Sequence, residues 1–365
     1  MNVRFTDLSS RFKVRKEKYI KALEKVLDSG QFIGGSFVRD FEEEIEHLLG
    51  IKHVVGVGSG TDALFLLLKY FDFKPGSEII TVPNSYLATV STIFLNNLKP
   101  VYASIDPLTL QIDTKSIEKL ITPKTVAIMG VHLTGSPCDI NALYTIAKNY
   151  KLKLLEDFSQ SFGAKIDNKY VGTISDASAA SLHPLKNLPC IGDGGIICTN
   201  NTRMSEWLIK ARSHGHPHRD ECDFWSFNMR LDSLQAVFAQ ESLKDLDTVL
   251  KKRKDLADIY LNNLQGINGV ETLNYKKNYT HTFHTFIILV KHRENLIKFL
   301  KKNDIEVVIH YPKLIPELKA HSKIIINKTD KLLNKRVLSL PISEEHTYKE
   351  VLEVCNKIKE FFHRE

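Results

Sequence analysis

The feature that most constrains the fold of this chain is the alternation of short apolar runs with longer amphipathic segments between residues 37 and 199. Continuous apolar runs of this kind are typical of strands that are covered on both faces of a sheet. We expect strands at 53–57, 78–82, 100–103, 127–131, 153–156 and 196–199, and helices at 37–49, 61–71, 86–95, 114–121 and 140–149. Strands separated by helices predict an α/β fold with a mostly parallel central sheet.

The pattern changes after about Leu231. A long helical stretch rich in Lys and Asp is expected at 233–264, followed by a strand at 282–290, a helix at 293–303, a strand at 306–309 and a terminal helix at 348–362. A chain of 365 residues also suits two domains. We therefore predict a large domain over residues 29–240, and a smaller α+β C-terminal domain over residues 241–365 that also takes in residues 1–28.

Several classes of protein are disfavoured by the chain as a whole. No apolar run approaches the roughly 20 residues that span a bilayer, and the N-terminus lacks the apolar core of a signal peptide. The five cysteines are scattered, odd in number and without the spacing of zinc ligands. We therefore expect a cytoplasmic protein with reduced thiols, with no membrane partner and no metal.

The formal net charge of +7 does not by itself define a partner. The densest basic run, residues 251–254, is flanked by Asp245, Asp247, Asp255 and Asp258, which is typical of a solvated helix face. Nucleic-acid binding would need a concentrated basic stripe, so we expect no nucleic-acid partner. A mild positive field is compatible with a small anionic substrate.

The first chemical motif is Gly58-Ser59-Gly60-Thr61-Asp62, which lies between an expected strand and an expected helix. Small residues let a ligand approach the backbone, and a helix N-terminus presents free N–H groups to an anion. The motif therefore suits a phosphate group. A capped turn without a ligand is the structural alternative, and the P-loop and dinucleotide patterns are both absent.

Two further motifs follow along the chain. Glu156 and Asp157 end an apolar strand, and in open α/β sheets ligands bind beyond the carboxyl ends of strands. Lys186 lies between a strand-like run and the turn at 192–195, with apolar neighbours that would lower its pKa and favour reaction with a carbonyl. Taken alone, the carboxylates could simply cap a helix or a turn, and the lysine could lie in a surface loop. Together, an anion cradle, a strand-end carboxylate and a lysine are what pyridoxal 5'-phosphate requires.

The chain resembles the DegT/DnrJ/StrS family of pyridoxal-phosphate sugar aminotransferases, which belong to the aspartate aminotransferase superfamily and have fold type I. The resemblance covers almost the whole chain and rests on ordered landmarks at 29–35, 58–64, 82–86, 131–135, 156–160, 181–195, 228–231, 309–312 and 338–341. It implies a fold type I transferase with a large cofactor domain and a smaller α+β domain. Members with dehydratase chemistry carry histidine at the lysine position, so Lys186 favours transamination.

The resemblance implies a role for each matching position. Lys186 would bind the cofactor's aldehyde and move the proton, and Asp157 would pair with the pyridine nitrogen. The remaining cofactor-binding positions are Gly60, Thr61, Tyr86, Gln160, Ser181 and Asn228, the last reaching the phosphate from the neighbouring subunit of a homodimer. The implied substrate-binding positions are His310, Tyr311, Arg212 and His214, for which a purely structural role is an equal alternative.

The implied activity is transfer of an amino group from glutamate to a keto-sugar. The sugar would be nucleotide-linked, of the 3-keto or 4-keto-6-deoxy type, in amino-sugar biosynthesis for a surface polysaccharide or a glycosylated product. The Gly-Asp-Gly-Gly loop at 192–195 favours a 3-keto acceptor. Two alternatives stay open: an aminotransferase for a different keto-sugar or a sugar acid, and a non-catalytic regulator that keeps the cofactor.

Overall fold

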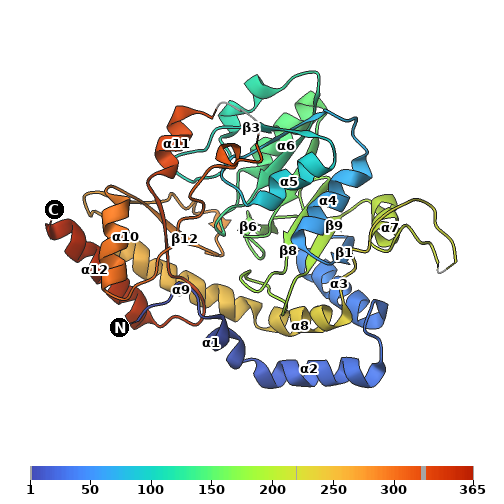
Figure 1. Ribbon diagram of the computed structural model, residues 1–365, viewed down its shortest axis with the longest axis horizontal. Coiled ribbons are helices and arrows are strands. Elements are labelled where there is room, and N and C mark those ends of the chain that lie inside the picture. The colour runs from blue at the N-terminus through green and yellow to red at the C-terminus, as the bar shows by residue number, and fades with distance from the viewer. Residues whose placement is uncertain (1, 219, 322–325, 365) are drawn as a thin grey trace.

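The computed structural model describes residues 2–218, 220–321 and 326–364, and a central sheet runs through its middle (Figure 1). Within these residues, seven strands pair in the order β1-β9-β8-β5-β4-β2-β3. Their bounds are β1 His53–Val57, β2 Glu78–Thr81, β3 Lys99–Tyr102, β4 Thr125–Val131, β5 Lys153–Asp157, β8 Ala177–Ser181 and β9 Gly195–Thr199. Only β9 runs against its neighbours, so the predicted, mostly parallel sheet is confirmed.

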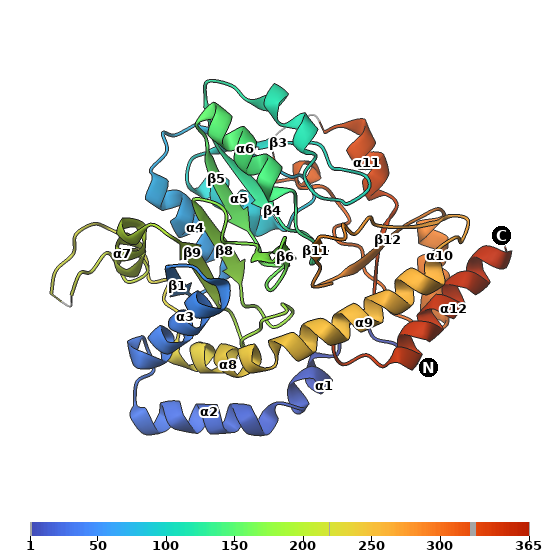
Figure 2. The same ribbon diagram turned by 180° about the vertical axis from the view of Figure 1, so that it is seen from behind.

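Both faces of this sheet are covered by helices, which explains why its strands are continuously apolar (Figures 1 and 2). Successive residues of a strand point to opposite faces, so Leu154 packs in one core cluster and Leu155 in the other. The first cluster includes side chains from α3 (Gly35–Leu49), α6 (Ile140–Tyr150) and α8 (Ser233–Lys244). The second includes α4 (Gly60–Phe71), α5 (Leu87–Leu95) and α7 (Thr202–Ala211).

The C-terminal part has its own core around an antiparallel three-stranded sheet. This sheet pairs β12 (Phe286–Val290) with β10 (Val270–Thr272) and β13 (Val337–Leu340), and neither partner strand was predicted. The surrounding helices are α9 (Leu246–Leu264), α10 (Arg293–Lys302) and α12 (Tyr348–Arg364), and Val3 belongs to the same core. The remaining elements are β6 Lys165–Ile166, β7 Lys169–Tyr170, β11 Tyr279–Thr280, α11 Lys328–Asn334 and the 3-10 turn Ile315–Glu317.

Several expected elements differ in the structure. The helical stretch at 233–264 is two helices that meet at Asp245, and the helix at 114–121 is a pair of 3-10 turns. The strand expected from residue 282 begins at Phe286, because Thr282 and Thr285 donate their N–H groups to the carbonyls of Gly135 and Thr134. The strand expected at 306–309 was wrong: only Val308 forms a bridge there, to Ser339.

The N-terminal segment lies against both parts of the chain. Helix α2 (Lys16–Ser29) packs on α8, and Tyr19 and Val26 share a cluster with Val237 and Phe238 (Figure 1). Helix α1 (Leu8–Lys13) instead reaches the C-terminal part through Arg11. The predicted domain boundary at residue 240 falls inside α8, and the two-domain division stays a prediction. No described helix is long and apolar enough to cross a membrane.

A buried charge network joins these segments. Arg11 Nε and Arg253 Nη2 donate to opposite oxygens of the Glu344 carboxylate, which follows β13. Burial alone would raise the pKa of Glu344, but the guanidinium groups of Arg253 and Arg11 lower it to about 2. The carboxylate is therefore charged in the folded protein at neutral pH.

This shift predicts an acid-sensitive contribution to folding. Because the folded pKa of Glu344 is depressed, its stabilisation is complete above about 4.5 and is lost as the pH falls toward 2. The free energy of unfolding of the wild type should fall by on the order of 3 kcal/mol over this window through this group. Glu344→Gln should be less stable than the wild type at pH 7, with a smaller further loss on acidification. Urea unfolding between pH 2 and 7 measures both, and parallel curves would contradict the prediction.

Candidate active site

Nine of the predicted positions line one cavity of about 410 Å³ at the edge of the central sheet. Strands β1, β5 and β8 run in the same direction, so the residues that follow their carboxyl ends meet at this edge. Segments from the C-terminal part complete the wall. The predicted residues that the structure brings together here are Gly60, Thr61, Tyr86, Asp157, Gln160, Ser181, Lys186, His310 and Tyr311.

The anion cradle forms at the start of α4. Ser59 caps this helix by accepting a hydrogen bond from the Asp62 N–H, and Gly60 is its first residue. A Cβ atom on Gly60 would lie 2.6 Å from the Cβ of Ser181, so only glycine allows β8 and the helix to approach this closely. The helix N-terminus and the hydroxyl groups of Ser59, Thr61 and Ser181 all border the cavity, which fits a phosphate group.

Asp157, the last residue of β5, is buried and held on both carboxylate oxygens. Oδ1 accepts a hydrogen bond from the Ser159 N–H at 3.1 Å, and Oδ2 accepts one from the Thr89 hydroxyl at 2.9 Å. The Thr89 hydroxyl in turn accepts from Ser85 at 2.7 Å. Two fixed donors keep the carboxylate oriented toward the cavity, as pairing with a protonated ring nitrogen requires.

The neighbouring carboxylate, Glu156, has a different role. It points to the opposite face of the sheet, where it is fully buried and accepts hydrogen bonds from His132 Nε2 and from the N–H groups of Gly172 and Ser175. Burial alone would raise the pKa of Glu156, but these hydrogen bonds, with that of His132 foremost, lower it. Of the two strand-end carboxylates, only Asp157 lines the cavity.

Lys186 enters the cavity from the loop between β8 and β9. Its amine has no hydrogen-bond partner among the described residues. Burial lowers the pKa of the Lys186 amine, and the charge of Asp157 offsets this only in part. A lowered pKa increases the fraction of neutral amine, which is the form that attacks an aldehyde and that accepts a proton.

Aromatic and amide side chains close the cavity. Tyr86, the N-cap residue of α5, is 55% exposed at the rim, and its ring centroid lies 6.1 Å from that of Tyr311. Gln160 accepts from the Thr134 N–H at 2.8 Å and donates to the Tyr311 hydroxyl at 3.2 Å. Burial, reinforced by Lys186, lowers the pKa of His310 to about 4, so His310 is neutral at physiological pH.

Three predicted positions lie outside this cavity. Arg212 donates to Glu42 and to the Gly56 carbonyl, so its guanidinium is committed to a structural contact that does not favour the predicted role in substrate binding. His214 and Asn228 lie on the segment between α7 and α8, where Ser213 and Asn228 form an isolated bridge and Arg230 bridges to Val57 of β1. Asn228 is exposed, which leaves it accessible to a second subunit.

Three residues in or beside the cavity were not assigned to the site from the sequence. Thr89 orients Asp157, and the signal that could have found it is its place one helical turn after Ser85 in the landmark at 82–86. His284 lies two residues ahead of the apolar run that forms β12, and burial, reinforced by Lys186, lowers its pKa well below the ordinary value. His183, three residues before Lys186, also lines the cavity.

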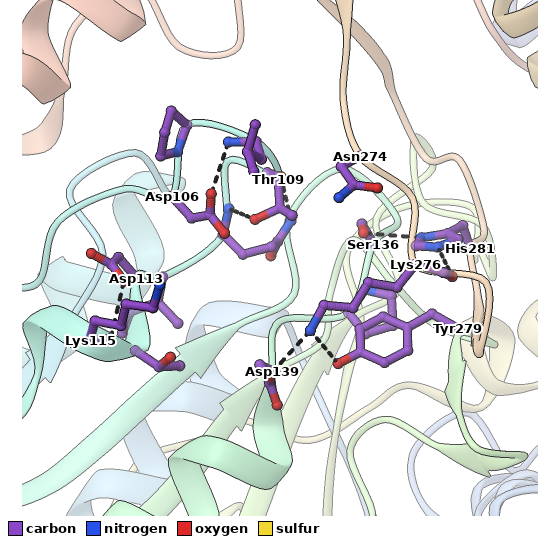
Figure 3. A pocket seen from close by; sticks show the side chains of 16 residues that line it. Asp106, Thr109, Asp113, Lys115, Ser136, Asp139, Asn274, Lys276, Tyr279 and His281 are labelled. Atoms are coloured by element: carbon purple, nitrogen blue, oxygen red, sulfur yellow. Dashed lines mark hydrogen bonds and ion pairs between the residues drawn. The ribbon is translucent and has the colours of Figure 1, made fainter.

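A second cavity, of about 440 Å³, lies between the loop at 106–115 and the segment at 274–281 (Figure 3). Lys276 donates there to Asp139 at 3.0 Å and to the Tyr279 hydroxyl at 3.3 Å, and Ser136 is 3.0 Å from His281 Nδ1. None of the predicted site residues lines it. The candidate active site is therefore the cavity that contains Lys186.

Comparison with known proteins defines the class of protein first. The model of the DegT/DnrJ/EryC1/StrS aminotransferase family matches residues 13–359, and the chain belongs to this family. The predicted family, fold type I architecture, aminotransferase class and pyridoxal-phosphate cofactor are thereby confirmed. Three groups on this chain fit the cofactor: Asp157, Lys186, and the glycine–hydroxyl cradle that Gly60 forms with the side chains of Ser59, Thr61 and Ser181.

Individual relatives match over nearly their full length. The dTDP-3-amino-3,6-dideoxy-alpha-D-galactopyranose transaminase of Aneurinibacillus thermoaerophilus is 35% identical over 98% of this chain and 99% of its own length. A Geobacillus stearothermophilus protein called pleiotropic regulatory protein is 34% identical over 99% of both chains. The crystal structure of S. venezuelae DesV in complex with a ketimine intermediate superposes with a TM-score of 0.96 at 30% identity, covering 100% of this chain and 99% of DesV.

Proposed function

We propose that this aminotransferase moves the amino group of glutamate to a nucleotide-linked keto-sugar in amino-sugar biosynthesis. The observation that carries the proposal is the convergence of Lys186, Asp157 and the glycine–hydroxyl cradle on one cavity, in a chain that belongs to an aminotransferase family. When bound, pyridoxal phosphate supplies an aldehyde that accepts the amino group and a cationic ring that withdraws electrons.

Each side chain has a definite task in this proposal. The amine of Lys186 would hold the cofactor at rest, and as a free base it would move the proton between the cofactor and the substrate carbon that gives up or receives the amino group. Asp157 keeps the ring nitrogen protonated. Gly60, Thr61 and Ser181 bind the phosphate, Gln160 orients the ring's hydroxyl side, and Tyr86 covers one face of the ring. His310 and Tyr311 contact the sugar.

We place the acceptor carbonyl at C3 of the sugar. The relative from Aneurinibacillus thermoaerophilus carries a 3-amino product in its name. The Gly-Asp-Gly-Gly loop at 192–195 is a second, sequence-based support. A thymidine or uridine diphosphate would supply the negative charge that suits a chain of net charge +7.

The test is direct. Purified protein loaded with pyridoxal phosphate is incubated with glutamate and, separately, with 3-keto and 4-keto-6-deoxy sugars linked to dTDP or UDP, and with a free keto sugar acid as the control. We expect 2-oxoglutarate and an aminated nucleotide sugar from a 3-keto acceptor. If only the sugar acid is turned over, the protein is instead an aminotransferase for a sugar acid.

One observation favours a second candidate, because a relative of 34% identity is called a regulatory protein. A regulator that keeps the cofactor would show the visible absorption of bound pyridoxal phosphate but no amino transfer to any acceptor. The Lys186 and Asp157 pair at the cavity favours the enzyme, because a regulator has no need of a free base beside the donor.

We further propose a cytoplasmic homodimer with shared active sites. The five cysteines are free, and Asn228 is exposed outside its own cavity beside exposed aromatic side chains, of which Trp225 is 93% exposed. A residue of this kind can reach the phosphate only in the partner subunit. The exposed aromatic groups are suited to an interface.

This arrangement predicts complementation between two inactive variants. Lys186→Ala and Asn228→Ala should each have little activity alone, because each breaks every site of its own dimer. After unfolding and refolding as a 1:1 mixture, half of the dimers are hybrids with one intact site, so about a quarter of wild-type activity should return. Light scattering measures the dimer. If the mixture stays as inactive as its components, Asn228 does not act across the interface.

A further inference from the structure

A buried arginine from the N-terminal helix holds the main chain of the loop that carries Lys186. Arg11 is 1% exposed, and its Nε donates to Glu344. Its two terminal nitrogens donate to main-chain carbonyls: Nη1 to Pro184 and Nη2 to Lys186 itself, each at 2.7 Å. All three nitrogens of the planar guanidinium therefore donate hydrogen bonds. Two of these bonds go to the loop at 182–190 that carries Lys186, which we call the lysine loop.

The carboxylate that holds Arg11 is itself fixed from the other side. Arg253 Nη2 donates to Glu344 at 2.9 Å, while Arg253 Nη1 donates to the carbonyls of Phe283 and Ile342 at 3.2 and 2.9 Å. Phe283 precedes His284, which lines the active-site cavity. The network thus connects the lysine loop to the C-terminal segments that form the opposite wall of the site.

A buried ionic network of this kind is better suited to fixing geometry than to adding stability, because desolvation of the charges offsets most of their attraction. Arginine suits the task because its five donors stand in a rigid plane, and a lysine ammonium cannot hold two carbonyls and a carboxylate in the same arrangement. The loop itself offers no equivalent constraint on these carbonyls, since its own main-chain bonds run from Lys186 N–H to His183 and from Cys190 N–H to Leu182.

We propose that Arg11, held in place by Glu344, is a positioning residue for Lys186: it fixes the main chain at Pro184 and Lys186, and so the approach of the Lys186 amine to the reacting carbon. The inference rests on the proposed role of Lys186 in binding the cofactor and moving the proton. A misplacement of a proton-transfer group by a fraction of an ångström slows the chemical step and leaves substrate binding nearly unchanged.

The decisive variant is Arg11→Lys in the full-length, cofactor-loaded enzyme. Hydrogen–deuterium exchange of the backbone amides at 182–190, measured without substrate, should speed up by about tenfold relative to the wild type. The kcat for transamination should fall by about tenfold or more, while KM for glutamate changes by less than about twofold. The kinetic isotope effect with glutamate deuterated at Cα should increase, because proton transfer becomes more rate-limiting.

Arg15→Lys is the matched control. Arg15 is also buried, pairs with Asp245, lies 3.7 Å from Glu344 and donates to the main-chain carbonyl of Arg11 at 3.4 Å, but among the described residues it makes no bond to the lysine loop. This variant should lower the thermal midpoint without altering exchange at 182–190, kcat or the isotope effect. Equal changes in both variants would show a general loss of stability and overturn the proposal, as would wild-type exchange and kcat in Arg11→Lys.

If Arg11→Lys does not fold, Glu344→Gln tests the same proposal, because it leaves Arg11 in the chain and removes the carboxylate charge that holds the guanidinium. It should show the same faster exchange and lower kcat. Failure of both variants to fold would assign the network to folding and reject the positioning role. If instead Lys186→Ala still transaminates, the proposed function fails, whereas the exchange at 182–190 still reports whether Arg11 orders the loop.

Discussion

Lys186→Ala should abolish transamination, with a fall in kcat on the order of 10⁴-fold or more, because the variant loses the cofactor's covalent partner and the base that moves the proton. Borohydride should no longer fix the cofactor to the protein. The cavity is otherwise intact, since the Lys186 amine makes no hydrogen bond to the described residues, so the thermal midpoint of the protein without cofactor should change little.

Two further measurements make this result specific. Small primary amines added to Lys186→Ala should restore part of the activity, because they can enter a cavity of this size and replace the missing base. Lys276→Ala removes a lysine from the second cavity, where it pairs with Asp139, and should transaminate like the wild type (Figure 3). Normal turnover by Lys186→Ala would refute the assignment of this residue.

Asp157→Asn should be the second most damaging change, with a fall in kcat on the order of 10³-fold. The amide keeps the size of the side chain, and its oxygen can still accept from the Ser159 N–H while its NH2 group faces the Thr89 hydroxyl, but it carries no charge to keep the ring nitrogen protonated. Cofactor should still bind and should still be trapped by borohydride, so the loss lies in the chemical step. Single-turnover measurement of the glutamate half-reaction gives the rate directly.

The adjacent carboxylate offers a matched control for this change. Glu156→Gln alters the residue before Asp157 on the same strand, but on the face where His132, Gly172 and Ser175 donate to it. We expect a loss of stability of about 3 kcal/mol, because a buried and fully bonded charge is removed, and a nearly unchanged kcat in the folded fraction. A large loss of kcat in Glu156→Gln with normal turnover in Asp157→Asn would reverse the two roles.

Much of the architecture could be predicted because local patterns of apolar residues specify it. Runs such as 127–131 are apolar on both sides, and only a sheet covered by helices on both faces buries them. The C-terminal part was predicted less well. Strand β10 is short and β13 carries Ser339 within it, so neither has a strong signal, and the strand expected at 306–309 lacks the partners to form one.

By itself, the sequence determined the chemistry of the candidate site: the cradle around Gly60, the carboxylate at a strand end and the lysine after an apolar run each follow from residue type and local order. Tertiary structure alone decided which groups meet. It placed Asp157 in the cavity and Glu156 behind it, committed Arg212 to Glu42, and brought Arg11 to the carbonyl of Lys186. The physical reason is that strand and helix periodicity act over a few residues, whereas hydrogen bonds between segments more than a hundred residues apart depend on how the whole chain packs.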